Sequence, residues 1–125
     1  MKSELNNFLI KKFSRQIILK NIGIIGQKKI LVSKVLIVGG GGLGCPVAEY
    51  LARAGIGTIG VVDDDKIVLS NIHRQSLFGT PDVGKFKVNI IKNKLKLINK
   101  STKVKKYKIR LNIKNYKKII NEYDY

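Results

Sequence analysis

Residues 34–44 read KVLIVGGGGLG, a β-branched apolar run followed by a run of glycines. The run Lys34 to Val38 is typical of a strand buried on both faces of a parallel sheet. The glycines fit the G-x-G-x-x-G pattern at Gly39, Gly41 and Gly44, and the residues from Leu43 to Ala54 have helical spacing. A strand, a glycine loop and a helix in this order predict a site for a phosphate at the helix N-terminus.

The segments after this unit repeat the alternation of strand and helix. A second buried strand is predicted at Thr58–Val62, and a helix at 83–99 with Val88, Ile91, Leu95 and Ile98 as its apolar stripe. A third strand is predicted at 104–109 and a closing helix at 114–121. This order predicts an α/β fold, a Rossmann-like parallel sheet with helices on both faces.

Other expectations concern the flanks of this fold. Helices are predicted at 8–19 and 27–33, so we divide the chain into an N-terminal helical arm at 1–33 and a nucleotide-binding half-domain at 34–125. In the helix at 43–54, Val47, Tyr50 and Leu51 are expected on one face, with Gly55 as the C-terminal residue. About three strands precede Tyr125, where a fourth is expected to begin, so we interpret the chain as the N-terminal portion of a larger fold.

Composition limits the classes of protein that fit this sequence. The chain has 125 residues, 44% hydrophobic and 26% charged, enough to form a folded core. We expect no secretory signal, because no small-residue cleavage site follows the apolar residues near Met1, and no apolar run reaches membrane-spanning length. A single cysteine, Cys45, indicates a reducing compartment, namely the cytoplasm or an organelle stroma. We expect Cys45 to be buried rather than nucleophilic.

The net charge of +17 is unevenly distributed and leaves two interpretations open. The excess positive charge flanks a slightly acidic middle at 35–84, and 21 of the 25 cations are lysines. An A/T-rich genome accounts for many lysines, and the phosphate clamps of nucleic-acid readers favour arginine. We therefore attribute the excess of lysine to an A/T-rich genome rather than to binding of a nucleic acid or an acidic partner.

The acid after the second strand extends the prediction to a nucleotide. Asp63 follows Gly39 by 24 residues, where an acid accepts hydrogen bonds from ribose hydroxyls. These residues alone fit NAD as well as ATP. A cluster of Asn71, Arg74 and Lys87 just beyond Asp63 favours a triphosphate, because it adds donors and charge that a dinucleotide does not need. An NAD-dependent oxidoreductase remains the alternative.

The ordered motifs resemble the adenylating enzymes that activate ubiquitin-like proteins and sulfur carriers, among them the molybdopterin-synthase and thiamine-biosynthesis adenylyltransferases. The resemblance runs from about Phe13 to the last residue. The stretches that carry it are Arg15-Gln16-Ile17, Gly39 to Cys45, Glu49 to Gly57 and Asp63 to Gln75.

The resemblance implies a role for several residues. Gly42 would line the nucleotide, Asp63 would hold the ribose, and Asn71 and Arg74 would contact the phosphates. Lys87 would neutralise charge as pyrophosphate leaves. The implied reaction is ATP-dependent adenylation of the C-terminal glycine of a sulfur carrier that ends in Gly-Gly.

The resemblance also implies partners. Arg15 would reach the γ-phosphate of a second subunit in a homodimer. The family's Mg²⁺ ligand is expected beyond Tyr125, so no metal ligand is assigned within the chain, and a complementing C-terminal fragment is an alternative partner. A non-catalytic remnant or split subunit that binds nucleotide or a dimer partner is the alternative function.

Overall fold

The structure is a computed structural model that describes residues 5–125. Its centre is a sheet of strands β1 (Lys34–Val38), β2 (Thr58–Val62) and β3 (Lys103–Tyr107), in the order β1-β2-β3. Both neighbouring pairs are parallel, with Val35 opposite Ile59 and Ile59 opposite Val104. The parallel α/β fold is therefore confirmed.

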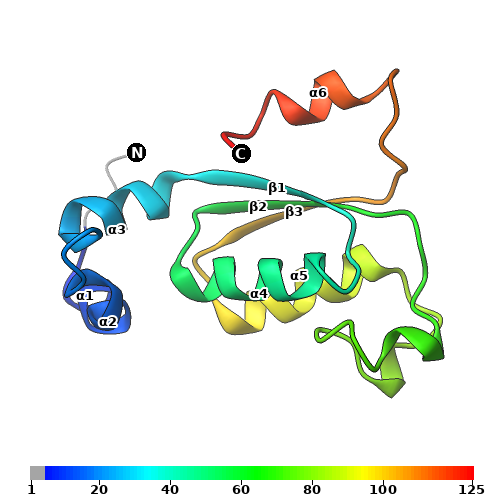
Figure 1. The fold of residues 1–125 in the computed structure, drawn as a ribbon, viewed down its shortest axis with the longest axis horizontal. Helices are drawn as coiled ribbons and strands as arrows, with labels where there is room; N and C mark the ends of the chain where they lie inside the picture. Colours follow the sequence, from blue (N-terminus) through cyan, green and yellow to red (C-terminus); the bar gives the residue numbers. More distant parts are fainter. Residues whose placement is uncertain (1–4) are drawn as a thin grey trace.

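Helices lie on both faces of this sheet. The crossover helices α4 (Gly44–Ala54) and α5 (Lys87–Ile98) cover one face, and the short α6 (Tyr116–Ile120) lies on the other side (Figure 1). Two 3₁₀ turns, η1 (Leu69–Asn71) and η2 (Thr80–Asp82), lie between β2 and α5. The main core fills the space between the sheet and α4 and α5, and includes Ile37, Cys45, Ala48, Ala52, Ile59, Val61, Val88, Ile91, Leu95 and Val104.

The N-terminal arm differs from the single helix predicted at 8–19. It forms α1 (Asn7–Lys12) and α2 (Ser14–Ile17), and the break falls at Phe13. Phe13 is only 3% exposed, and its ring occupies the space where a side chain at Gly55 would project. Burial of the Phe13 ring stabilises the arrangement with two short helices over a single continuous helix. Helix α3 (Gly23–Val32) begins four residues before the predicted start at Gln27.

The burial predicted for the first strand is wrong, and the buried face of α4 consists of other residues than the apolar face expected from the sequence. On β1 Ile37 alone is buried and Val38 is exposed. Successive side chains point to opposite faces, and Ile37 lies on the face covered by α4 and α5, whereas the other face is covered only in part by the short α6 and the C-terminal segment (Figure 1). In α4, Val47 and Tyr50 are exposed, and the buried face consists of the small residues Cys45, Ala48 and Ala52. Small side chains let α4 lie close to the sheet, which hydrophobicity alone does not reveal.

Helix α5 has the predicted apolar stripe but a later start. Val88, Ile91 and Leu95 are buried as predicted, and Ile98 is partly buried against them. The helix begins at Lys87 rather than residue 83, because Phe86 is extended and pairs with Lys66 in an isolated antiparallel bridge. The predicted strand at 104–109 and helix at 114–121 are likewise shorter in the structure, as the bounds of β3 and α6 show.

The carboxyl end of the chain lies along the outer edge of β1. The amide of Asp124 donates to the carbonyl of Lys34, and the amide of Leu36 donates to the carbonyl of Tyr125. The Tyr123 ring lies over Gly60, so this face of β2 is covered by the C-terminal segment. None of the helices described is both long and apolar enough to cross a membrane.

Candidate nucleotide site

The glycine loop joins β1 to α4 in a turn that tolerates little side-chain volume. A Cβ at Gly44 would lie 1.9 Å from the carbonyl oxygen of Gly39, and one at Gly40 would lie 2.6 Å from Ile91. Gly39 has a φ of 99°, in the region that favours glycine. A Cβ at Gly41 would lie 3.8 Å from the side chain of Gln75, and one at Gly42 would lie 3.5 Å from the side chain of Arg74. The loop is thus tight at its ends and open in its middle.

The open part of the loop presents unpaired donors at the start of α4. Within residues 5–125, the amides of Gly41, Gly42, Leu43 and Gly44 donate to no backbone or side-chain acceptor. The first paired amide is that of Cys45, which donates to the carbonyl of Gly41 at 2.9 Å. Unpaired amides together with the positive end of a helix dipole favour an anion such as phosphate.

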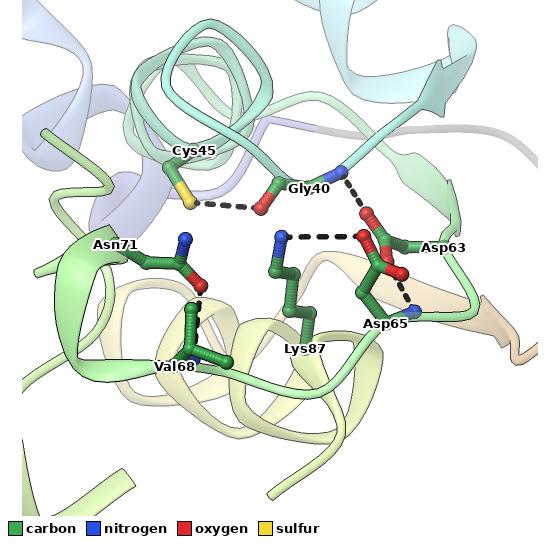
Figure 2. A network of polar contacts seen from close by, with 7 residues as sticks. All are labelled: Gly40, Cys45, Asp63, Asp65, Val68, Asn71 and Lys87. Carbon is green, nitrogen blue, oxygen red and sulfur yellow. Dashed lines mark hydrogen bonds and ion pairs between the residues drawn. The ribbon is translucent and has the colours of Figure 1, made fainter. Parts of the chain in front are cut away.

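Asp63 fixes the loop from the end of β2. Its Oδ2 accepts from the amide of Gly40 at 2.8 Å, and its Oδ1 accepts from the amide of Asp65 at 2.7 Å (Figure 2). A carboxylate has about four lone-pair sites, so both oxygens can still accept from a ligand hydroxyl. A groove of about 180 Å³ opens beside Asp63 and is lined by Val38, Gly39, Val62, Asp63, Asp64, Ile109, Arg110 and Leu111.

Asn71 is the last residue of η1, and Arg74 lies in the turn that follows it. Asn71 is 8% exposed, its Oδ1 accepts from the amide of Val68, and its Nδ2 points towards the space around Lys87 (Figure 2). Arg74 is exposed, its stem lies beside Gly42, and one guanidinium nitrogen donates to the carbonyl of Ser70 at 3.0 Å. The turn therefore brings an amide donor and a permanent cation to the open part of the glycine loop.

Lys87 is the central cation of the site. Its side chain is 8% exposed, and its Nζ lies 3.7 Å from Oδ2 of Asp65, which is 69% exposed (Figure 2). The bridge between Lys66 and Phe86 holds the two segments together. A buried ammonium is costly unless it is paired and hydrogen-bonded. Among the described residues the ammonium of Lys87 has one ion pair, the long contact with the exposed Asp65, so it is poised to neutralise an anion.

Cys45 lies behind the glycine loop. Its Sγ is 3.6 Å from the carbonyl oxygen of Gly40, and the residue is fully buried. Burial is the main influence on the pKa of the Cys45 thiol and raises it, against smaller lowering effects from a backbone hydrogen bond and from Lys87. The thiol is therefore neutral and unsuited to nucleophilic attack, and the expectation of a buried cysteine is confirmed.

Arg15 is not part of this arrangement within one chain. It lies in α2, next to Gln16, whose Nε2 donates to the carbonyl of Ala54 at the C-terminal end of α4. The glycine loop lies at the other end of α4, about 16 Å away for an 11-residue helix. The structure thus brings together the glycine loop, Asp63, Asn71, Arg74 and Lys87 but leaves Arg15 apart.

The acidic run Asp63–Asp65 does not form a magnesium cage. Its carboxylates lie within 4.8 Å of one another, but Asp63 is bonded to two backbone amides and Asp65 faces Lys87. Mg²⁺ requires near-octahedral oxygen ligands and retains several waters. We assign no metal ligand to these residues.

Sequence reasoning missed two contributors to the site, Asp65 and Gln75. No role is assigned to Asp65 from the sequence, because its pairing with Lys87 depends on the bridge between Lys66 and Phe86, which lie far apart in the chain. Gln75 ends the motif that begins at Asn71, but it was given no role of its own, and its burial against the glycine loop is a tertiary effect.

The strand order, the crossover helices and the glycine loop define a Rossmann-like α/β protein with a glycine loop of unpaired amides after its first strand. A comparison with protein families gives the same result more specifically, because the ThiF family matches residues 13–125. The chain belongs to the ThiF family.

Curated relatives cover nearly the whole chain. It is 42% identical over 122 residues to a probable molybdopterin-synthase adenylyltransferase of Gracilaria tenuistipitata var. liui, covering 98% of this chain and 34% of that protein. It is 40% identical over 115 residues to a sulfur carrier protein adenylyltransferase of Thermus thermophilus, covering 92% of this chain and 42% of that protein. The chain thus spans about a third of the length of such relatives.

Solved structures share the fold. E. coli tRNA N6-threonylcarbamoyladenosine dehydratase in complex with AMP superposes with a TM-score of 0.88 over 95% of this chain and 48% of that chain, at 24% identity, which shows the fold alone. E. coli MccB with AMPCPP and MccA is 41% identical, with a TM-score of 0.67 over 69% of this chain and 26% of that chain.

Proposed function

We propose that this chain binds ATP, with its phosphates on the glycine loop. The observation that carries the proposal is the Lys87 ammonium, which is buried at this loop and whose ion-pair partner within residues 5–125 is the exposed Asp65, at 3.7 Å. The amides from Gly41 to Gly44 are unpaired within residues 5–125, and the Nδ2 of Asn71 points towards the space around Lys87 (Figure 2). Donors and positive charge that converge in a partly dry site suit a polyphosphate.

The same geometry gives an orientation for the nucleotide. The groove beside Asp63 lies at the carboxyl ends of the strands, where ligands of parallel α/β sheets bind. We place the adenosine in this groove, with its ribose hydroxyls donating to Asp63. The phosphates then extend past Gly42 towards Arg74 and Lys87, which is why a triphosphate fits better than NAD.

We further propose that the bound ATP is used to adenylate the C-terminal glycine of a ubiquitin-like sulfur carrier, as in molybdopterin or thiamine biosynthesis. A carboxylate oxygen of that glycine would attack the α-phosphorus. The bond from the α-phosphorus to the bridging oxygen would break, and pyrophosphate would leave as the acyl-adenylate forms. Support comes from the names of the curated relatives, which are adenylyltransferases, one of them for a sulfur carrier protein.

A homodimer would complete this site. Arg15 is exposed and lies one length of α4 away from its own glycine loop, so a second copy is needed to bring such an arginine to the phosphates. The exposed side chains of Leu43, Val47 and Tyr50 lie at positions i, i+4 and i+7 of the α4 region, on one side of the helix. An apolar stripe of this kind next to the loop suits contact with a second copy.

A second candidate is nucleotide or partner binding without turnover. It is favoured by the acidic run, whose carboxylates are engaged by backbone amides and Lys87 and offer no magnesium cage. For either function we propose a reducing compartment, the cytoplasm or an organelle stroma, in which the thiol of Cys45 stays reduced.

The test has two stages. Calorimetric titration of the 125-residue chain with ATP and magnesium is expected to show binding that exceeds binding of NAD and weakens in Arg74→Ala. Exchange of labelled pyrophosphate into ATP is then measured with a sulfur carrier ending in Gly-Gly, and with the same carrier lacking those glycines as control. Exchange that depends on the glycines supports adenylation, and binding without exchange supports the second candidate. Absence of ATP binding overturns adenylation and nucleotide binding, and leaves partner binding alone.

A further inference from the structure

Among the residues that the structure describes, four amide side chains are buried, and their hydrogen bonding depends on where they lie. Gln27 and Asn99, remote from the glycine loop, have both amide atoms paired. Gln27 donates from Nε2 to the carbonyl of Ala54 and accepts at Oε1 from Gln16, at 3.0 and 2.7 Å. Of the two beside the loop, Asn71 has only its oxygen paired, and Gln75 has no side-chain hydrogen bond within residues 5–125.

Gln75 is held in place by its backbone and its neighbours. Its amide N–H donates to the carbonyl of Asn71 at 2.9 Å, and its carbonyl accepts from Phe78 at 3.1 Å. The residue is 3% exposed, between the buried Asn71 and the buried Leu77 and Phe78. Its Oε1 is buried and unpartnered. Buried polar atoms of native proteins nearly always have a partner, so this atom calls for an explanation.

The nitrogen end of this amide faces the glycine loop. Nε2 lies 3.8 Å from the position that a Cβ at Gly41 would take, and Arg74 occupies the equivalent space at Gly42. Successive residues of the turn thus present their side chains to successive glycines. Phosphate oxygens are expected on this loop, and they accept hydrogen bonds. The nitrogen end of the Gln75 amide, which donates, is the end that faces the loop.

We infer that Gln75 is a further nucleotide-binding residue, whose Nε2 donates to a phosphate oxygen held against Gly41. The inference rests on the proposed ATP site and adds to it a neutral donor between the loop amides and the Arg74 guanidinium. A hydrogen bond to an ionised acceptor is about twice as strong as a neutral one. Such a bond gives the Gln75 side chain a partner at Nε2, where it has none within residues 5–125 without nucleotide.

A pair of matched substitutions separates this binding role from a structural one. Gln75→Met keeps the length of the side chain and removes both polar ends, so we expect a melting temperature equal to or above that of the wild type. We expect its affinity for ATP and for AMP to fall about 10-fold, with adenosine affinity unchanged, because the lost donor is a phosphate contact. Gln27→Met removes a fully paired amide, and we expect the opposite pattern, a lower melting temperature and unchanged ATP affinity.

The readouts are calorimetric titration with ATP, AMP and adenosine, and thermal unfolding without nucleotide, on the 125-residue chain. Gln75→Glu is a second variant that keeps the shape and is expected to weaken ATP binding further, because a carboxylate repels phosphate. Wild-type ATP affinity in Gln75→Met, or an equal loss for adenosine, would overturn the inference while the ATP site stands. A wild type that binds no ATP overturns the proposed function and this inference with it.

Discussion

The Nζ atom of Lys87 lies 3.7 Å from Oδ2 of Asp65, a carboxylate that is itself 69% exposed. The two partners differ in burial, because Lys87 is buried and Asp65 is largely solvated. Water screens the carboxylate, so it compensates only part of the desolvation cost of the ammonium. Lys87 thus contributes little to the stability of the fold. Its positive charge remains available to attract an anion bound on the glycine loop.

Replacing Lys87 should therefore affect binding more than folding. In Lys87→Met we expect an unchanged or raised free energy of unfolding, because a buried and weakly paired charge is removed. We expect ATP affinity to fall by about 1.5–3 kcal/mol, as for loss of a charged hydrogen bond. Urea unfolding and calorimetry measure the two quantities. Asp65→Asn is the control, with wild-type ATP affinity or better, and an equal loss of affinity in Asp65→Asn would contradict this role of Lys87.

Two glycines of the loop should respond differently to an added methyl group. Gly44→Ala places a Cβ 1.9 Å from the carbonyl oxygen of Gly39, a contact with backbone that must shift, and we expect a loss of stability of about 3 kcal/mol or more together with loss of ATP binding. Gly42→Ala meets only the flexible stem of Arg74 at 3.5 Å, so its stability should stay within about 1 kcal/mol of wild type. Thermal unfolding of both variants is the measurement. Equal destabilisation would show that the loop is looser than described.

Tyr123 should make stability depend on alkaline pH. Its hydroxyl lies 2.9 Å from that of Tyr107, over Gly60, and desolvation raises the pKa of Tyr123 above its ordinary value of 10.0. The unfolded chain loses this proton at a lower pH than the folded chain, so the stabilisation is complete below pH 10.0 and declines as the pH rises further.

The comparison of wild type with Tyr123→Phe isolates this effect from the many lysines. We expect the difference in free energy of unfolding between the two proteins to shrink from neutral pH to above pH 10, measured by urea unfolding at several pH values. At neutral pH the substitution should cost about 1 kcal/mol for the hydrogen bond to Tyr107. A difference that stays constant across this range would argue against the buried phenol.

Arg15 can be tested by mixing two inactive variants. If Arg15 serves the site of a second copy, Arg15→Ala and Lys87→Met each abolish pyrophosphate exchange alone. A mixed dimer then has one intact site, which combines Lys87 of one copy with Arg15 of the other. We expect pyrophosphate exchange to return when the two variants are mixed. The sum of their activities measured separately should stay at background. Failure to regain exchange in a mixture shown to form mixed dimers would contradict the role of Arg15 across the interface.

The sequence by itself determined the parallel α/β fold and most of the site. The apolar runs at β1 and β2, the glycine loop and the stripe of α5 depend on residues close together in the chain, and local periodicity is enough to identify them. Asp63, Asn71, Arg74 and Lys87 follow these elements at short spacings, and the fold brings them to one edge of the sheet.

Only the tertiary structure decided the features that depend on distant contacts. The break at Phe13 follows from its packing near Gly55, and the exposed outer side of α4 follows from small residues against the sheet. The pairing of Lys87 with Asp65 needs the bridge between Lys66 and Phe86. The burial of Gln75 without a partner was likewise invisible in sequence, because whether an amide is satisfied depends on atoms that folding brings to it.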